Sequence, residues 1–215
     1  MLVSANDKGG SRQRMSSSER KEAIVREAIR LFSERGFRGT TTRELAAAVG
    51  VTEPVLYQHF ATKRDLYTAI IDTKSREGHD KLGAELERYI EMNDDLGFFT
   101  RLGELAMDWY EGSPEFIRLL YFSALEGHEL SEIAHERLAT SFFEMIAGYI
   151  QRRIDAGALR QVDAKLAARS FVGMVAYYAI GTTIFRCPQT ADRKVVISTM
   201  VSIFLDGMSA RNVRE

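Results

Sequence analysis

Apolar residues recur at helical intervals along most of the chain. The first set begins after Ser16 and places four of them on one face of a helix: Ile24, Ala28, Leu31 and Phe32. Ser16 and Glu19 have the spacing of a capping box, and Gly36 can adopt the left-handed conformation that ends a helix. The pattern therefore predicts a helix from Ser16 to about Gly36.

Two short helices are predicted next. Thr41 has Glu44 three residues later as a reciprocal cap, and Gly50 breaks the helix that follows them. Another helix starts at Thr52 and tolerates Pro54, because amides in the first turn have no partner within the helix. The short Gly50-Val51 connection suits two helices that meet at a steep angle, which is typical of a helix-turn-helix.

Longer amphipathic helices are predicted for the rest of the chain. One opens at Thr62, which has Asp65 at the capping-box spacing, and runs toward Tyr89. The others cover residues 95–111, 114–127, 130–155, 163–186 and 192–210. Alternating runs that would indicate strands are short and lack hairpin turns. We expect an all-α fold of about nine helices, divided into a tail (1–15), a helix-turn-helix domain (16–63) and a helical domain (64–215).

Charge is distributed unevenly between these regions. Residues 1–63 hold 11 basic and 7 acidic side chains, whereas the remainder holds 18 and 23. A basic front end on an acidic body is the asymmetry expected if only the front meets phosphates, although chance variation on a solvated surface is the alternative.

The second helix of a helix-turn-helix places its N-terminal part in the major groove, where base edges can be distinguished. Gln58 can pair with an adenine, and Pro54 or Val55 can touch a thymine methyl group. Glu53 is either a reader of cytosine or a solvated charge at the helix start. The candidate DNA-binding residues are Thr41, Thr42, Arg43, Thr52, Glu53, Pro54, Val55, Tyr57, Gln58, His59 and Lys63.

Residues 20–67 resemble the tetracycline-repressor (TetR) family of regulators. The resemblance rests on segments 28–32, 35–37, 40–46, 49–52, 56–60 and 63–66, which agree with the family in type and spacing. It implies that Thr42, Tyr57, His59 and Lys63 contact the DNA backbone, while residues 52–55 help to choose the sequence. It also implies a homodimer with a variable helical ligand-binding domain. A three-helix scaffold that makes only protein contacts is the alternative for this segment.

The helical body is rich in aromatic residues and methionines, which line adaptable apolar pockets but at helical spacing also form ordinary cores. Candidate ligand-binding residues are Leu102, Leu105, Trp109, Phe116, Leu119, Leu120, Phe142, Phe143, Met145, Met174, Tyr177 and Tyr178. Candidate polar anchors are Glu104, Asp108, Arg118, Glu126, His128 and His135. The two histidines fit ordinary surface or core positions better than a metal pair, and no metal or cofactor is expected.

The last two helices carry apolar stripes that suit a four-helix contact with a two-fold mate. The candidate dimer residues are Phe171, Val175, Ala179, Thr182, Ile197, Val201, Phe204 and Met208. The alternative is that these helices simply close the core of one subunit.

Several features narrow the function. Cys187 is the only cysteine, so an intrachain disulfide and a cysteine-based zinc site are excluded. The longest uncharged run, residues 171–185, is too short for a membrane helix, and the polar start lacks the apolar stretch of a signal peptide. We expect a cytoplasmic protein. Catalytic motifs such as a nucleophile elbow, a phosphate loop or a dinucleotide fingerprint are absent, and no enzyme is expected.

The sequence thus predicts a transcriptional regulator that binds double-stranded DNA as a homodimer. The resemblance to the family implies that it represses transcription. It is then expected to leave a palindromic operator when a small apolar or aromatic effector binds. The alternatives are a helical adaptor or a small-molecule-binding protein that does not bind DNA.

Overall fold

The computed structural model describes residues 16–126, 129–189 and 191–209, and regular structure in these ranges is helical throughout. The exception is an isolated antiparallel bridge between Leu159 and Ser209. The expected all-α fold is confirmed. The predicted tail and His128 lie outside the described residues.

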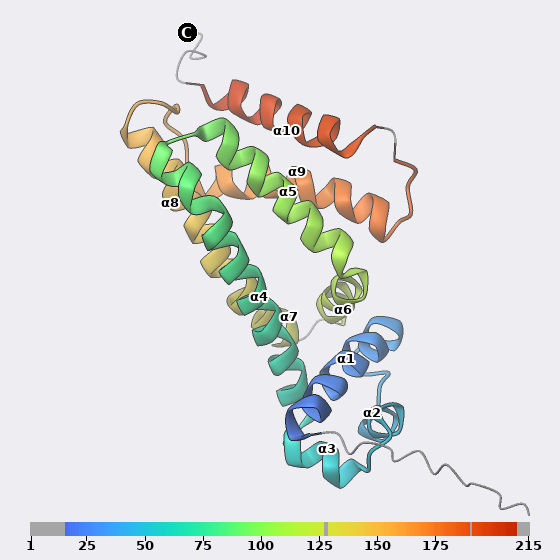
Figure 1. The fold of residues 1–215 in the computed structure, drawn as a ribbon. Helices are drawn as coiled ribbons and strands as arrows, with labels where there is room; N and C mark the ends of the chain where they lie inside the picture. Colours follow the sequence, from blue (N-terminus) through green and yellow to red (C-terminus); the bar gives the residue numbers. More distant parts are fainter. Residues whose placement is uncertain (1–15, 127–128, 190, 210–215) are drawn as a thin grey trace, which may run out of the picture.

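The first three helices form a compact head at one end of the molecule (Figure 1): α1 (Ser17–Arg35), α2 (Thr42–Val49) and α3 (Glu53–His59). The capping boxes predicted at Ser16 and Thr41 are both present. Thr52 precedes α3 as predicted, but its side chain makes no capping hydrogen bond. Gly36 and Gly50 follow α1 and α2 with φ of 71° and 75°, values that favour glycine.

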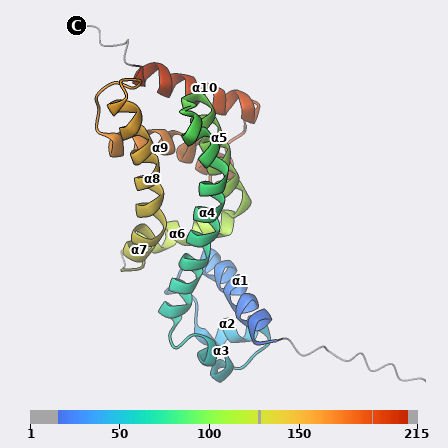
Figure 2. The ribbon, with the colours of Figure 1, turned by 60° about the vertical axis from the view of Figure 1, so that its left-hand side comes forward.

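Helix α4 (Lys63–Met92) connects the head with the body. Its 30 residues begin beside α3 and run up to the start of α5 (Figures 1 and 2). The Thr62 side chain accepts a hydrogen bond from the backbone N–H of Asp65, as the predicted cap requires. One continuous helix thus reaches from the head into the body.

The body contains α5 (Asp95–Gly112), α6 (Pro114–Leu125), α7 (Glu129–Ala134), α8 (Thr140–Asp155), α9 (Ala164–Thr183) and α10 (Arg193–Met208). Residues His135–Ala139 form a π-helical turn, η1, that joins α7 to α8. The helix predicted over residues 130–155 is therefore continuous, although its hydrogen-bond pattern changes within it. The other predicted helices end within a few residues of the observed bounds, whose final turns the periodicity alone does not resolve.

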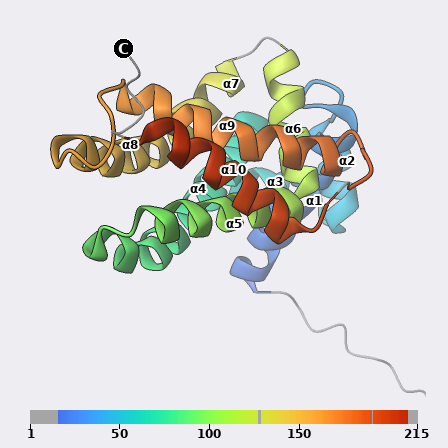
Figure 3. The same ribbon diagram turned by 90° about the horizontal axis from the view of Figure 1, so that it is seen from above.

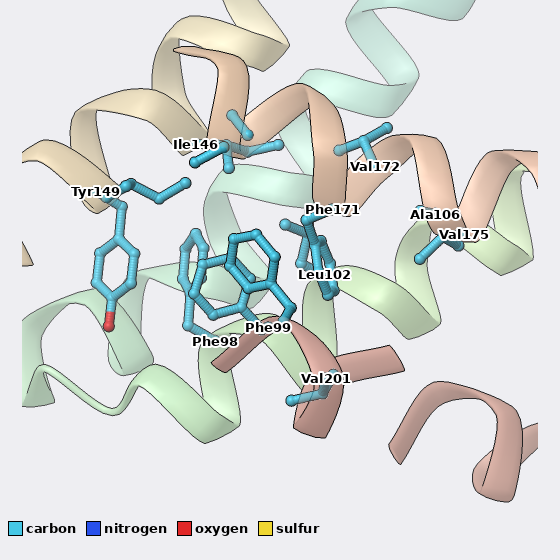
Figure 4. Close-up of a cluster of buried hydrophobic side chains, with 14 of the residues drawn as sticks. Phe98, Phe99, Leu102, Ala106, Ile146, Tyr149, Phe171, Val172, Val175 and Val201 are labelled. Carbon is cyan, nitrogen blue, oxygen red and sulfur yellow. The ribbon is translucent and has the colours of Figure 1, made fainter. Parts of the chain in front are cut away.

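The core of the body is built from large side chains of α5, α8, α9 and α10 (Figure 4). Phe98 stacks on Tyr149 with ring centroids 3.9 Å apart. Phe99 meets Phe171 and Phe204 edge-on or tilted, at 4.9 and 4.8 Å. These contacts fix α5 between α8, α9 and α10.

A second core lies under the head and extends beyond it. It contains Leu45 and Leu56 from the two short helices, together with Tyr67 from α4. Phe116 and Leu119 of α6 belong to the same cluster. The head therefore packs against a helix of the body, and its core crosses the domain boundary predicted at residue 63.

The residues predicted for the dimer interface lie on the inner faces of α9 and α10, so the predicted face is wrong. Seven of its eight residues are buried within the subunit, where they complete the body core: Phe171, Val175, Ala179, Ile197, Val201, Phe204 and Met208. The eighth, Thr182, is half-buried and donates a hydrogen bond to the carbonyl of Ala179. An apolar stripe marks the buried face of a helix, and here α5 already covers that face.

The free faces of α9 and α10 carry other large apolar side chains. Leu166, Tyr177, Val195 and Ile203 are 62%, 84%, 54% and 62% exposed. Viewed from above, α10 lies across this end of the molecule beside α9 (Figure 3). Within the described ranges, the structure has no helix with the length and hydropathy needed to span a membrane.

Candidate functional site

The predicted DNA-binding residues lie on α2, α3 and the start of α4, at the end of the molecule remote from α10 (Figure 2). Six of them are exposed: Thr41, Arg43, Thr52, Pro54, Tyr57 and Gln58. The other five are half-buried: Thr42, Glu53, Val55, His59 and Lys63. Exposed side chains on α3 leave its outer face open to a partner, while Leu56 on the opposite face is fully buried.

A short chain of hydrogen bonds ties α3 to α2. The Tyr57 hydroxyl donates to the Thr42 hydroxyl at 3.2 Å, and Thr42 donates to a carboxylate oxygen of Glu53 at 2.7 Å. Glu53 therefore uses one oxygen inside the protein, which neither alternative from the sequence anticipates. The bonds fix the phenol of Tyr57 above the N-terminus of α2, where backbone N–H groups favour an anion.

Lys63 supports the turn between α1 and α2. Its ammonium donates to the backbone carbonyls of Phe37 and Thr40 at 2.7 and 2.9 Å, and lies 4.2 Å from the centre of the Phe37 ring. Burial lowers the pKa of Lys63, and the negative charge of Glu126 partly opposes this effect. An ammonium has three donors, so one remains for a further acceptor.

These groups surround a shallow depression of about 450 Å³ between the start of α2 and the α3–α4 junction. Its lining includes Arg38, Thr42, Tyr57 and Lys63. The two cations are suitable donors to the oxygens of a phosphate, and the two hydroxyls can donate to it in exchange for their internal hydrogen bonds. Sequence reasoning missed Arg38, although its position in the turn before the capping residue Thr41 puts a basic side chain beside a helix start.

Glu126 joins the body to the head, which corrects its prediction as a ligand anchor. It follows α6, and its Oε1 atom accepts a hydrogen bond from the backbone N–H of Arg38 at 3.4 Å. Its Oε2 atom is buried and has no hydrogen-bond partner among the described residues. The carboxylate is held under the turn that presents α2, away from the cavity described next.

The body contains a cavity of about 500 Å³ between α4, α5, α6, η1 and α8, within the range of small-molecule sites. Six of the predicted ligand residues line it: Leu105, Trp109, Leu120, Phe142, Phe143 and Met145. Asp108 and His135, two of the predicted polar anchors, also line it. Burial raises the pKa of another lining residue, Tyr110, to about 12.

The other six predicted ligand residues do not line this cavity. Leu102 is buried in the body core, and Phe116 and Leu119 are buried in the head core. Met174 and Tyr178 pack against the body core, whereas Tyr177 is 84% exposed. Aromatic character alone did not distinguish a lining residue from a core residue, because both kinds of site favour the same side chains. Glu104 and Arg118 form ion pairs with Arg101 and Glu115 and do not line the cavity either.

Sequence reasoning missed the wall that α4 contributes. Its lining residues are Lys74, Ser75, Glu77, Gly78, Lys81 and Leu82. Charged residues at helical spacing usually mark a solvated face, which is why they gave no signal. Gly78 was the available clue, since a glycine inside a helix costs stability unless something needs the space.

Comparison with known proteins identifies both parts of the chain. Residues 24–70 match the family model described as bacterial regulatory proteins, tetR family. Residues 104–207 match the model of the AefR-like transcriptional repressor, C-terminal domain. Together these regions span well over half of the chain. The chain belongs to the TetR family. It is a DNA-binding transcriptional regulator, and the resemblance read from residues 20–67 is confirmed.

Individual relatives are similar to the chain over different lengths. The nucleoid occlusion factor SlmA of Marinobacter nauticus is 29% identical over 142 residues, which are 66% of this chain and 70% of SlmA. The class C tetracycline repressor protein of Escherichia coli is 41% identical, over only 27% of each chain. The structure of AibR in complex with isovaleryl coenzyme A and operator DNA has the same fold, with a TM-score of 0.62, 24% identity, and coverage of 86% of this chain and 97% of AibR.

Proposed function

We propose that this TetR-family protein is a homodimeric, cytoplasmic repressor. It binds an inverted-repeat operator through α2 and α3, and a small, largely apolar effector in the body cavity releases it. The observation that carries the proposal is the path of α4, whose first turn lies at the depression beside α2 and whose middle forms a wall of the cavity.

DNA binding is proposed to use two kinds of contact. Gln58 and Pro54 project from the exposed face of α3, which places an amide and an apolar ring where base edges would lie. Thr42, Tyr57 and Lys63 surround the depression and would hold a phosphate of the adjacent backbone. The predicted roles of these residues, base reading for the first set and positioning for the second, are thus compatible with their exposure.

Dimerisation is proposed to use the free faces of α9 and α10. Leu166, Tyr177 and Ile203 expose large apolar surfaces there, although they are absent from the stripe expected from the sequence. A two-fold axis that passes beside these helices and runs along the length of the subunit would place the two heads on the same side of the dimer and match the symmetry of an inverted repeat.

Coupling between cavity and head is proposed to run through α4 and α6. Beside the cavity, α4 is tied to η1 by the Ser75 hydroxyl, which donates to the carbonyl of Arg137, and by the Arg137–Asp72 ion pair. An effector that binds one arrangement of these helices better than the other shifts the spacing of the two heads. The AibR structure holds isovaleryl coenzyme A and operator DNA in one complex, which supports the presence of a ligand site and an operator site in one chain of this fold.

The test is selection of DNA by the purified protein from sheared genomic fragments of its source, followed by sequencing at moderate salt. The proposal predicts enrichment of a few fragments that share an inverted repeat. A folded, ligand-free protein that enriches no fragment would contradict it and favour a helical adaptor. Arg43→Gln is the control, because loss of this exposed cation should reduce enrichment without unfolding the head.

A further inference from the structure

The α4 wall of the cavity carries three charged side chains. Lys74, Gly78 and Lys81 lie at intervals of four and three residues, and Glu77 directly precedes Gly78, so all four lie on one side of α4. The lining from α8 and α9 is mostly apolar and includes Phe142, Phe143, Met145 and Val172. A molecule that fills this cavity therefore meets hydrocarbon from α8 and α9, charged groups from α4, and Asp108 and His135 from α5 and η1.

The carboxylates that line the cavity already have cationic partners. Glu77 pairs with Lys74 at 2.9 Å. Asp108 pairs with Arg193, whose guanidinium also bonds the backbone carbonyl of Glu104 at 2.8 Å. Lys81 is exposed and forms no ion pair within the described ranges of the chain. Among the described lining residues, the charge without an ionic partner is therefore that of the Lys81 ammonium, and a second basic side chain, His135, lines the cavity from η1.

Gly78 opens the α4 wall between these charged residues. A Cβ atom built on Gly78 would meet no atom within 4 Å, so its face of the helix borders empty space. A glycine in the middle of a helix costs about 1 kcal/mol relative to alanine. The notch lies one helical turn from Lys74 and one from Lys81, so a group passing it comes within reach of both ammonium groups.

We infer, on the basis of the proposed function, that the effector is an amphipathic anion. Its hydrocarbon chain lies among Phe142, Phe143 and Met145, and its carboxylate or phosphate head lies at the Gly78 notch against Lys81. A neutral aromatic molecule would leave Lys81 unused, and a cationic one would be repelled by it. This narrows the apolar or aromatic effector expected from the sequence to one chemical class.

The test uses single-chain probes that differ only in the head group: decanoate, decyl phosphate, decanol and decyltrimethylammonium. The only tryptophan of the chain, Trp109, lines the cavity, so its fluorescence reports occupancy. We expect at least one of the two anions to bind about fivefold more tightly than decanol, and the cation to bind most weakly. Comparison of decanoate with decyl phosphate identifies which anionic head the rim prefers.

Variants test whether residues at the rim of the cavity cause the preference for an anionic head group. Lys81→Gln should abolish the preference for the anion and leave decanol affinity unchanged, whereas Lys165→Gln, on the exposed start of α9, should leave both unchanged. Gly78→Phe should weaken all four probes by filling the notch. Decanol binding as tightly as both anions, binding of none of the probes, or an unchanged preference in Lys81→Gln would overturn the inference. None of these results affects operator selection, which tests the proposed function separately.

Discussion

Glu126 lies so close to Gly36 that a Cβ atom on Gly36 would come within 2.2 Å of Glu126 Oε1. The two residues belong to different parts of the molecule, since Gly36 ends α1 and Glu126 follows α6. Gly36 has φ 71° and ψ 173°, a region occupied almost exclusively by glycine. The turn that presents α2 therefore depends on a residue without a side chain, and a carboxylate from the body occupies the space.

Gly36→Ala should destabilise the head. The strained backbone costs about 1–3 kcal/mol for a residue with a Cβ atom, and the new methyl group displaces the carboxylate of Glu126. Gly50→Ala is the matched control, because Gly50 has a left-handed conformation with open space around it and should cost only about 1 kcal/mol. Urea denaturation measures both. Equal losses would show that the contact with Glu126 and the unusual ψ of Gly36 have no consequence.

Lys63→Met and Arg43→Gln should separate a cation that also stabilises the head from one that serves only operator binding. Lys63→Met removes two charge-assisted hydrogen bonds to carbonyls and should lower the free energy of unfolding by about 1–2 kcal/mol. Arg43→Gln should leave unfolding unchanged and reduce the salt slope of operator binding by about one. The measurements are urea denaturation and operator titrations from 50 to about 200 mM salt. If the free energy of unfolding of Lys63→Met equalled that of the wild type, the hydrogen bonds of Lys63 would not stabilise the turn.

Gln58→Ala should relax the preference at one base pair in each half-site. Gln58 is exposed on α3, and loss of a bidentate contact with a base costs about 1–3 kcal/mol. Competition between operators that differ at single positions measures the effect. If the variant lost affinity equally for every sequence, Gln58 would be a backbone contact instead.

Ile203→Glu should shift the protein from dimer to monomer without unfolding it. Ile203 is an exposed apolar residue of α10, and a carboxylate buried at a two-fold interface faces its own copy across the axis. Leu125→Glu is the control, since Leu125 is 83% exposed on α6, away from α9 and α10. Sedimentation velocity over a concentration series measures both. If Ile203→Glu remained a dimer, the dimer interface would have to lie on another part of the surface.

Ionisation of Tyr110 should lower the free energy of unfolding in alkali. Burial raises the pKa of its phenol from 10 to about 12, so the folded state favours the neutral form. The unfolded state ionises first as pH rises, and the contribution of Tyr110 is complete below pH 10 and lost between pH 10 and 12. By pH 11 wild type should lose about 1 kcal/mol more than Tyr110→Phe. Parallel losses in the two proteins would show that Tyr110 ionises equally in both states.

The sequence was most informative where local chemistry determines structure. Ser16–Glu19 and Thr41–Glu44 specify helix starts through contacts three residues apart, and both capping boxes are present. The helix-turn-helix followed from the same short-range signals. The stripe that contains Phe171 and Ile197 also correctly indicated buried helix faces. Periodicity does not say which partner buries a face, so the subunit core was taken for a dimer interface.

The cavity shows the complementary limit. Trp109 and Phe142 were predicted as lining residues because large flexible or aromatic side chains often line pockets, but Leu102 and Phe116 satisfy the same rule and belong to cores. Lys81 looks like an ordinary solvated residue in sequence. Only the packing of α4 against α5 and η1 shows which side chains border empty space.

The central claim is that occupancy of the cavity controls operator binding. The most direct measurement is the affinity of the wild-type dimer for its selected inverted repeat, with and without a ligand whose occupancy is followed by Trp109 fluorescence. Allosteric coupling of the usual size predicts operator affinity lowered by about 5- to 150-fold at saturation. Unchanged operator affinity while Trp109 reports a filled cavity would contradict the account.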